Sequence, residues 1–465
     1  MAQVIILGAG LNGLSTAMVL ARDGHDVTVL ERDAAEPPPA AQAWDDWSRQ
    51  GVNQFRLPHF MLSRWRTLME QELPEALAAV RSAGGTTVNS VALLPEAVRG
   101  PIRPTDDRFD TVTARRPVLE AAIAGVAANM PEVTIRRGVT VTGLRSDVRT
   151  GPPHVTGVLI EGGQTLSADL VVDCTGRRSA LGSWLDAIGA RHPVEEREDC
   201  GFVYYARHFR GKSPDVRTVL VQPHDSVTVL TLPADGDTWS VVLAISNRDH
   251  ALRCLRDPST FDRALAQYPL AAHWREGTPI SNVDAIAGIE DRYRRLVVDG
   301  EPVATGVVVV GDAWACTNPS LGRGASIGLL HALSLRDVLR DVDPADPDKL
   351  VRRFDELTTT VVEPLYRLTL WFDRHRLDEL NADVAGGPHR TDDQRWPVAK
   401  ATLAAALVDP EIARGYASLM QLLTTPTELL AQPGVFDRVI ELGAQAPRYP
   451  IPGPDRHALL TAITD

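Results

Sequence analysis

Three glycines near the start of the chain have the spacing of a phosphate-binding turn. Gly8, Gly10 and Gly13 follow a short β-branched apolar run and precede residues with helical periodicity. The first glycine of such a turn allows the bend, the second lets a pyrophosphate approach the backbone, and the third permits close helix packing. Glu31 lies where a carboxylate can accept hydrogen bonds from an adenosine ribose. The pattern predicts a dinucleotide site, and by itself it does not choose between NAD and FAD.

A second motif far along the chain favours FAD. The apolar run Val307–Val310 is typical of a buried strand, and it ends at Gly311 and Asp312. An aspartate at this point can hold a hydroxyl of a ribityl chain, which NAD lacks. The glycine-rich loop 318–324 then opens a helix. Its free N–H groups and helix dipole would stabilise negative charge on a reduced flavin ring.

A third motif, Asp173–Ser179, again ends an apolar strand in an acidic residue and a turn. It is weak by itself. Taken in order with the other two, it makes the chain resemble the flavoprotein monooxygenases built on the para-hydroxybenzoate hydroxylase fold. That resemblance implies that FAD reacts with O2 to form a flavin C4a-hydroperoxide, which passes one oxygen atom to the substrate. The family's flavin performs the bond chemistry, so no catalytic triad is expected.

Further segments resemble one branch of these enzymes, the flavin-dependent epoxidases of polyether biosynthesis. They are Arg49–Gln54, Arg116–Leu119 and Tyr204–Arg207. The resemblance implies that Arg49 and Arg116 lie against the FAD phosphates or the flavin edge. It makes Tyr204 and three further residues candidates for the substrate pocket, and we predict those three as catalytic: His59, Tyr205 and Arg207. The family usually has proline at the position of Asn53, so we expect this loop to differ.

The predicted cofactor site combines the three motifs with these arginines and their neighbours. No metal ligand is expected, because the four cysteines lie far apart without CxxC or Cys/His spacing. The predicted FAD-binding residues are Gly8, Gly10, Leu11, Asn12, Gly13, Glu31, Arg32, Arg49, Arg116, Val141, Asp173, Gly176, Gly311, Asp312, Pro319, Gly322, Gly324 and Ala325.

The elements needed to position these residues can be predicted from hydrophobic periodicity. The pattern indicates a βαβ unit, then a β-rich stretch, then a second parallel strand and a long helix, and finally a mostly helical end. The fold class is therefore α/β (α+β): a Rossmann-like FAD-binding domain with an inserted antiparallel-sheet substrate domain and a helical C-terminal region. We expect an FAD-binding domain at 1–185, with a substrate-domain insertion near 80–112; the antiparallel sheet at 186–295; the second part of the FAD-binding domain at 296–340; and the helical region at 341–465. Two expected elements bear on the outcome below: a helix over 64–81 and a strand over 134–141.

The composition and net charge of the chain limit the kinds of partner that it can bind. The chain has 465 residues and a net charge of −12, so its field repels phosphate backbones and anionic membranes. We expect no nucleic acid partner and no membrane span, and we place the protein in a reducing cytoplasm. No second GxGxxG motif exists, so no separate nicotinamide domain is predicted. The first lysine is Lys212, whereas flavin halogenases need a lysine early in the chain.

The sequence thus predicts a cytoplasmic FAD-dependent monooxygenase, a hydroxylase or an epoxidase, acting with O2 on a neutral, hydrophobic intermediate of natural-product (antibiotic) biosynthesis. The electron source is NAD(P)H or a partner flavin reductase. One alternative stays open, because certain [4+2] cyclases of spirotetramate assembly resemble the same fold and keep FAD without using its redox chemistry. A non-catalytic flavin sensor is disfavoured, since nothing resembles an output domain.

Overall fold

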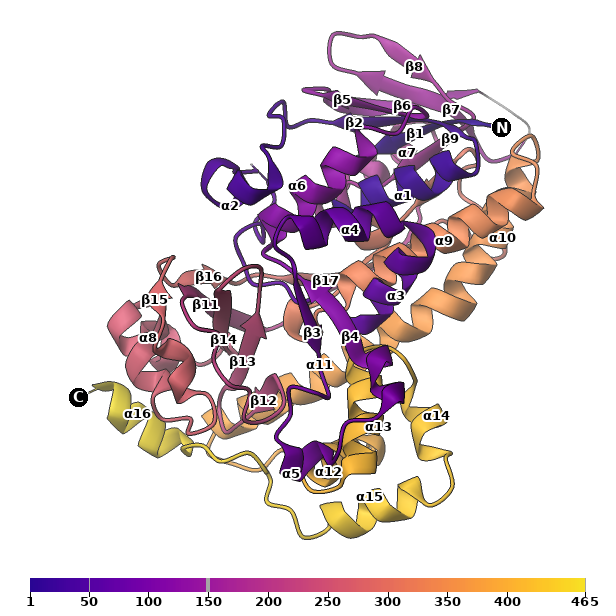
Figure 1. The fold of residues 1–465 in the computed structure, drawn as a ribbon. Coiled ribbons are helices and arrows are strands. Elements are labelled where there is room, and N and C mark those ends of the chain that lie inside the picture. The colour runs from indigo at the N-terminus through magenta and orange to yellow at the C-terminus, as the bar shows by residue number, and fades with distance from the viewer. Residues whose placement is uncertain (50, 148–150, 465) are drawn as a thin grey trace.

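The computed structural model describes residues 1–49, 51–147 and 151–464. A five-stranded parallel sheet forms the centre of one half of the molecule, the half predicted to bind a nucleotide (Figure 1). Leu7 pairs with both Leu30 and Asp173, so three strands end at one edge of the sheet. That register brings Gly8 and Glu31 together. The strand order is β20 (Val307–Val309), β9 (Leu170–Asp173), β1 (Gln3–Leu7), β2 (Asp26–Glu31) and β5 (Val133–Arg137).

Helices cover one face of this sheet, and a small antiparallel sheet lies over the other (Figure 1). The Asn12 side chain, at the start of the first helix, packs against the backbone of two later glycines. A Cβ on Gly311 would lie 2.4 Å from Asn12 Nδ2, and a Cβ on Gly328 would lie 2.3 Å from Asn12 Oδ1. Both glycines therefore make room for the Asn12 side chain. The covering elements are α1 (Leu11–Arg22), α6 (Arg116–Ala127), α9 (Gly324–Asp341), β6 (Val141–Asp147), β7 (His154–Ile160) and β8 (Thr165–Ser167).

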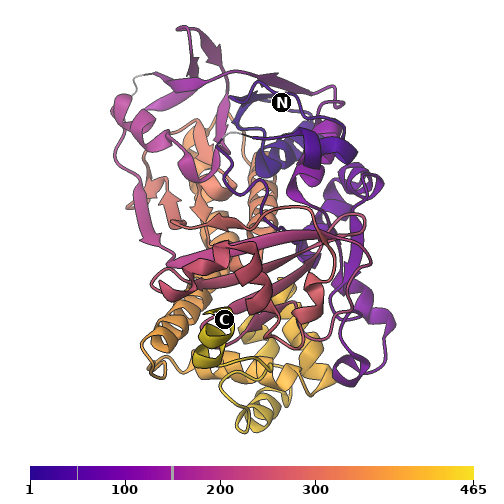
Figure 2. The same cartoon turned by 90° about the vertical axis from the view of Figure 1, so that its left-hand side faces the viewer.

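The antiparallel sheet of the substrate half packs its two faces against different parts of the chain. One face shares a hydrophobic core with the carboxyl ends of the parallel strands. The other is covered by α8 (Pro258–Leu265) and α16 (Arg456–Thr464), so the C-terminus returns beside the sheet (Figure 2). Its strands are β12 (Val221–Pro223), β13 (Thr228–Pro233), β14 (Thr238–Ser246), β11 (Phe202–Arg210), β15 (Thr278–Pro279) and β16 (Asp284–Ile286).

The C-terminal helices lie below the antiparallel sheet in the view of Figure 1, except the first of them, which packs against α9. A five-residue π-helical turn, Thr358–Val362, joins two of them. These helices are α10 (Pro347–Leu357), α11 (Glu363–Val384), α12 (Arg395–Ala406), α13 (Pro410–Met420), α14 (Pro426–Leu430) and α15 (Val435–Gly443). The remaining helices and strands are α2 (Ala43–Asp46), α3 (Ser63–Glu72), α4 (Pro74–Ser82), α5 (Glu96–Arg99), α7 (Leu181–Ala187), β3 (Thr86–Asn89), β4 (Asp110–Thr113), β10 (Val194–Asp199), β17 (Glu290–Arg295), β18 (Val297–Val298), β19 (Glu301–Pro302) and β21 (Ala315–Cys316).

The predicted fold class is confirmed, and two expected elements are corrected. The helix expected over 64–81 is two helices, because Pro74 has no N–H to continue the first and instead begins the second. The strand expected over 134–141 is split into β5 and β6 at Gly138, whose φ is +68°. No helix among the described residues is long and apolar enough to cross a membrane.

Candidate active site

One continuous cavity of about 510 Å³ connects the edge of the parallel sheet with the antiparallel sheet. The glycine turn after β1 and the carboxylate of Glu31 line its first end. Mostly apolar side chains line the second end, among them those of Leu230, Val242 and Met420. The cavity therefore joins the predicted nucleotide site to an apolar chamber.

The glycine turn has room for a bound pyrophosphate. The contacts that an added Cβ atom would make at each of the three glycines show this. A Cβ on Gly13 would lie 1.9 Å from the backbone oxygen of Gly8, and Gly8 itself has a φ of +96°. These two glycines are required by the protein's own packing. A Cβ on Gly10 would meet nothing nearer than an Arg49 nitrogen at 4.0 Å. The space above Gly10 is thus open to the cavity, as the approach of a pyrophosphate requires.

A chain of buried charges surrounds this end of the cavity. Arg49 donates to Glu31 at 2.6 Å and to Glu120 at 2.7 Å, and Arg116 donates to the second oxygen of Glu120 at 2.6 Å. Glu31 also accepts from the backbone N–H of Ala9 at 2.9 Å. Burial alone would raise the pKa of Glu120, but the two arginines outweigh it and lower that pKa. Sequence reasoning placed Arg49 and Arg116 here and missed the carboxylate between them.

His59 extends this chain and is held as a neutral ring. Its Nδ1 lies 2.9 Å from the carbonyl oxygen of Leu57, and its Nε2 lies 3.2 Å from an Arg116 nitrogen. A carbonyl only accepts and a guanidinium only donates, so Nδ1 carries the proton and Nε2 accepts. Burial and the Arg116 charge lower the pKa of His59 to about 3. Both ring nitrogens are therefore engaged, an arrangement suited to positioning Arg116. His59 also lines the cavity, and its predicted catalytic role stays a prediction.

Asp312 faces the cavity, and its carboxylate accepts no hydrogen bond from a described residue. Burial raises its pKa, and the charges of Arg116 and Arg177 oppose that rise. A Cβ on Gly324 would lie 3.9 Å from Asp312 Oδ1, so the neighbouring loop leaves open space beside the carboxylate. A free acceptor in an open pocket fits a ribityl hydroxyl.

Asp173, predicted to contact FAD, lies behind the cavity wall and does not line it. It is fully buried and accepts from the Thr175 N–H at 2.8 Å, from the Thr175 hydroxyl at 2.6 Å, and from Ser179. These bonds hold the turn that presents Gly176 to the cavity, and Asp173 itself does not line it. Gly13 and Gly311 likewise lie behind the lining and support it through packing.

The other predicted cofactor residues all line the cavity. Gln50, part of the predicted flavin-contacting stretch, lies outside the described residues. The lining residues are Gly8, Gly10, Leu11, Asn12, Glu31, Arg32, Arg49, Arg116, Val141, Gly176, Asp312, Pro319, Gly322, Gly324 and Ala325.

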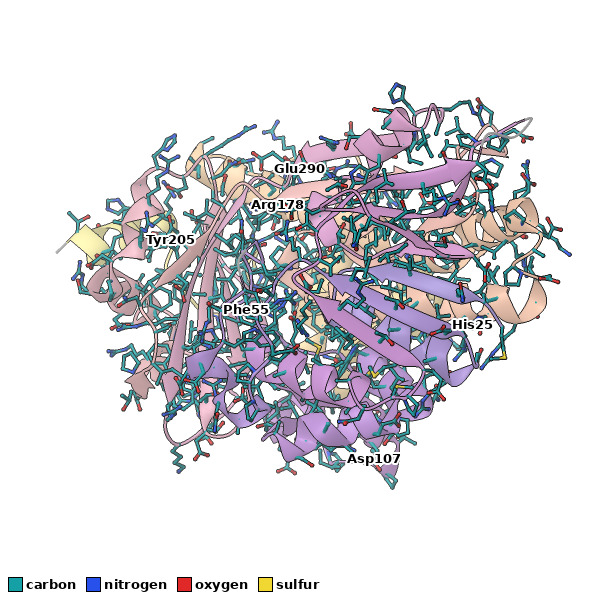
Figure 3. All side chains as sticks on the ribbon, turned by 90° about the horizontal axis from the view of Figure 1, so that it is seen from above. His25, Phe55, Asp107, Arg178, Tyr205 and Glu290 are labelled. Atoms are coloured by element: carbon teal, nitrogen blue, oxygen red, sulfur yellow. The ribbon has the colours of Figure 1, made fainter. Side chains whose placement is uncertain are left out.

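The two faces of β11 separate the predicted substrate residues. Tyr204 lines the cavity and donates its hydroxyl to the side-chain oxygen of Asn318. Tyr205 points to the opposite face, among the side chains under α8 and α16 (Figure 3). Arg207 lies on that face too and pairs with Asp262 of α8 at 2.8 Å. The catalytic positions predicted for Tyr205 and Arg207 are thus corrected, because successive strand residues alternate between faces.

Neither a metal site nor a reactive thiol lies in this cavity among the described residues. Among them, no group of three His, Cys, Asp or Glu side chains could hold a metal ion. Burial raises the pKa of Cys174 and of Cys316, the two cysteines in the cavity wall, which keeps both thiols protonated and unreactive. The arrangement is therefore suited to holding a nucleotide cofactor beside an apolar ligand.

Comparison with known proteins agrees with this geometry. The FAD dependent oxidoreductase family model matches residues 3–43, and the FAD binding domain family model matches residues 110–352. Rv3254 of Mycobacterium tuberculosis is 29% identical over 391 residues, which is 79% of each chain. PqsL of Pseudomonas aeruginosa, described as a probable FAD-dependent monooxygenase, superposes with a TM-score of 0.61 at 19% identity, covering 82% of this chain and 96% of PqsL. The Diels-Alderase PyrE3 of the pyrroindomycin pathway superposes with a TM-score of 0.55 at 17% identity, covering 90% of this chain and 80% of PyrE3.

Proposed function

Since this chain belongs to the FAD binding domain family, we propose that it is an FAD-dependent monooxygenase that transfers one oxygen atom from O2 to a largely apolar natural-product intermediate. The reaction is epoxidation or hydroxylation of an electron-rich carbon framework. The resemblance of Arg49–Gln54 to the polyether-type flavin epoxidases favours epoxidation.

The observation that carries this proposal is the continuity of the cavity. The residues suited to the nucleotide, Gly10 and Asp312, line the same space as the apolar side chains of the antiparallel sheet. A flavin held by the first group would present its ring to a substrate in the second. Separate pockets for cofactor and substrate would not support such a transfer.

The chain's own residues bind, orient and exclude water. The open backbone at Gly10 would accept the pyrophosphate, Glu31 the ribose and Asp312 the ribityl chain. The amino end of α9, which follows Gly322, directs its free N–H groups and the positive end of its dipole toward the cavity. FAD, when bound and reduced, supplies the electrons with which O2 is activated. Apolar walls limit access of water to that chemistry.

The alternative is a non-redox cyclase on the same fold, in which FAD stays bound and only shapes the chamber. The likeness of fold to PyrE3 keeps this candidate in view, and the contacts to FAD suggested above would serve either activity. The two activities differ in what they consume. A monooxygenase needs O2 and reductant, whereas a cyclase needs neither.

The test loads the protein with FAD or with 5-deaza-FAD and supplies a panel of polyene and phenolic compounds under ¹⁸O2. Reductant is NAD(P)H in one arm and a separate flavin reductase in another. We expect a product containing one ¹⁸O atom with FAD and reductant, and none with 5-deaza-FAD. A product of unchanged mass that forms equally with 5-deaza-FAD and without reductant would instead establish the cyclase.

A further inference from the structure

Arg323 is a buried cation at the amino end of α9. Its side chain lines the cavity, and the residue is 6% exposed. One guanidinium nitrogen donates to the hydroxyl of Thr369 at 3.0 Å, and its Nε has no hydrogen-bond partner among the described residues. Asp373 is near enough to act on it electrostatically, but no hydrogen-bonded ion pair joins Arg323 to a described carboxylate. Two arginines at the nucleotide end of the same cavity, Arg49 and Arg116, are by contrast both paired.

Two physical effects oppose placing a charge here. Removing a guanidinium from water is costly unless a partner compensates. A cation at the amino end of a helix also faces the positive end of the helix dipole, which is unfavourable. Arg323 therefore does not stabilise the ligand-free fold through its charge. A buried charge that the protein itself compensates only in part is explained by a ligand that supplies the opposite charge.

The neighbours of Arg323 place its head group on the substrate side of the cavity. They are Thr369 and Asp373 of α11 and Tyr416 of α13. Burial lowers the pKa of Arg323 to about 10, so it stays charged at neutral pH, and Asp373 and Tyr416 oppose that lowering. Asp373 compensates this charge only in part. Burial raises the pKa of Asp373 to about 7, Ser320 donates to one of its oxygens, and its Oδ2 has no hydrogen-bond partner among the described residues, so no hydrogen bond joins it to Arg323.

Tyr416 adds a second donor to this end. It lines the cavity, and burial raises its pKa to about 12, so its hydroxyl is protonated at neutral pH. That hydroxyl forms no hydrogen bond with a described residue. The apolar side chains of Met420 and Ala417 lie on the same helix in the cavity wall. One charged donor, one neutral donor and an apolar wall suit a carboxylate at the end of an apolar chain.

We propose that Arg323, assisted by Tyr416, binds a carboxylate of the substrate, so that this enzyme acts on an apolar carboxylic acid rather than on a neutral molecule. The inference rests on the proposed function, because it names the substrate class of the same cavity. It replaces the neutral substrate expected from the sequence. The acid group fixes one end of the substrate among the C-terminal helices, which leaves its apolar chain directed along the chamber.

The test measures binding by calorimetry, which needs no turnover. The FAD-loaded, oxidised enzyme is titrated with decanoate and with decanamide, which differ only in the charged end. We expect decanoate to bind at least about tenfold more tightly, the range of a hydrogen bond to a charged group. Arg323→Met should abolish that preference, and Arg323→Lys should restore part of it. Equal binding of both probes to the native enzyme, or a preference that survives in Arg323→Met, would overturn the proposal.

Two controls separate this role from others. Arg253→Met removes an exposed arginine on the far side of the antiparallel sheet and should keep the native preference. Without ligand, Arg323→Met should unfold at the same temperature as the native enzyme or higher, because an uncompensated charge is removed. A lower unfolding temperature would assign Arg323 a structural role and contradict the proposal.

A third measurement addresses the other anion that Arg323 could face, a reduced flavin. We expect the midpoint potential of the bound flavin to be unchanged in Arg323→Met. A lowered potential with an unchanged decanoate preference would assign the arginine to the flavin and overturn the proposal. Carboxylate binding without any ¹⁸O-labelled product would leave this inference standing while the proposed oxygenation failed. Oxygenation of neutral compounds at rates unchanged in Arg323→Met would leave the proposed oxygenation standing and overturn this inference.

Discussion

Glu120→Gln should show how much the buried charge network contributes to stability. Glu120 is 1% exposed and is the only ion-pair partner of Arg116 among the described residues, while Arg49 keeps Glu31. Removing one partner of a buried pair leaves an uncompensated charge, which costs about 3 to 5 kcal/mol. Glutamine keeps the volume and one acceptor oxygen, so we expect the lower end, about 3 kcal/mol. The free energy of unfolding is measured by urea titration with tryptophan fluorescence.

A matched control is Glu301→Gln, which breaks an ion pair with Arg352 whose side chains are 60% and 36% exposed. That change should cost less than about 1 kcal/mol, because solvent screens exposed pairs. The effect of Glu120→Gln should also depend on pH. The pKa of Glu120 in the folded protein lies below its ordinary value of 4.5, so its contribution is complete above that pH and is lost as pH falls through the folded pKa. Equal costs for the two variants at pH 7, or a difference that grows in acid, would refute the reasoning.

Three further changes test the cavity. Gly10→Val should weaken FAD binding without unfolding the protein. Gly13→Ala should prevent folding, because its Cβ would meet the Gly8 oxygen. Absorbance of bound flavin measures the first effect, and circular dichroism measures the second. Asp312→Ala should weaken FAD binding by about 1 to 3 kcal/mol, the loss of a hydrogen bond to a charged group, and an unchanged FAD titration would remove it from the site. Tyr204→Phe should lower the free energy of unfolding by about 1 kcal/mol and leave FAD affinity unchanged, as thermal unfolding and FAD titration would record.

The nucleotide end could be predicted from sequence because its chemistry is local. Gly8, Gly10 and Gly13 lie within six residues. The backbone itself requires Gly8 and Gly13, and the approach of a pyrophosphate accounts for Gly10. Asp312 follows its own strand directly, so hydrophobic pattern was enough to place it at the carboxyl edge of the sheet. Glu120 was missed for the opposite reason. It lies inside the helix that begins at Arg116, and its second partner, Arg49, is 71 residues away.

At the substrate end, one feature of the sequence was overlooked and another feature of the site could not be predicted from sequence. Tyr204 and Tyr205 are neighbours on a strand, so the alternation of side chains already required that only one could face the cavity. Arg207 shares the face of Tyr205 and could have been excluded with it. The wall formed by Tyr416 and Met420 was beyond prediction, since no local pattern relates α13 to β11, and only tertiary packing brings them to one space.

The two ends of the cavity differ in how their charges are balanced, and that difference bears on where specificity lies. At the nucleotide end Arg49, Glu31, Glu120 and Arg116 compensate one another before any ligand arrives, so this end is preorganised for a cofactor that stays bound. At the other end Arg323 is hydrogen-bonded to no described carboxylate, and Asp373 compensates its charge only in part. A charge left open contributes binding energy only when its ligand supplies the partner, which suits a molecule that must be recognised and exchanged at every turnover. Discrimination between substrates should therefore reside in the loop before α9 and in the C-terminal helices facing it, while the glycine turn and its charge network serve the cofactor alone.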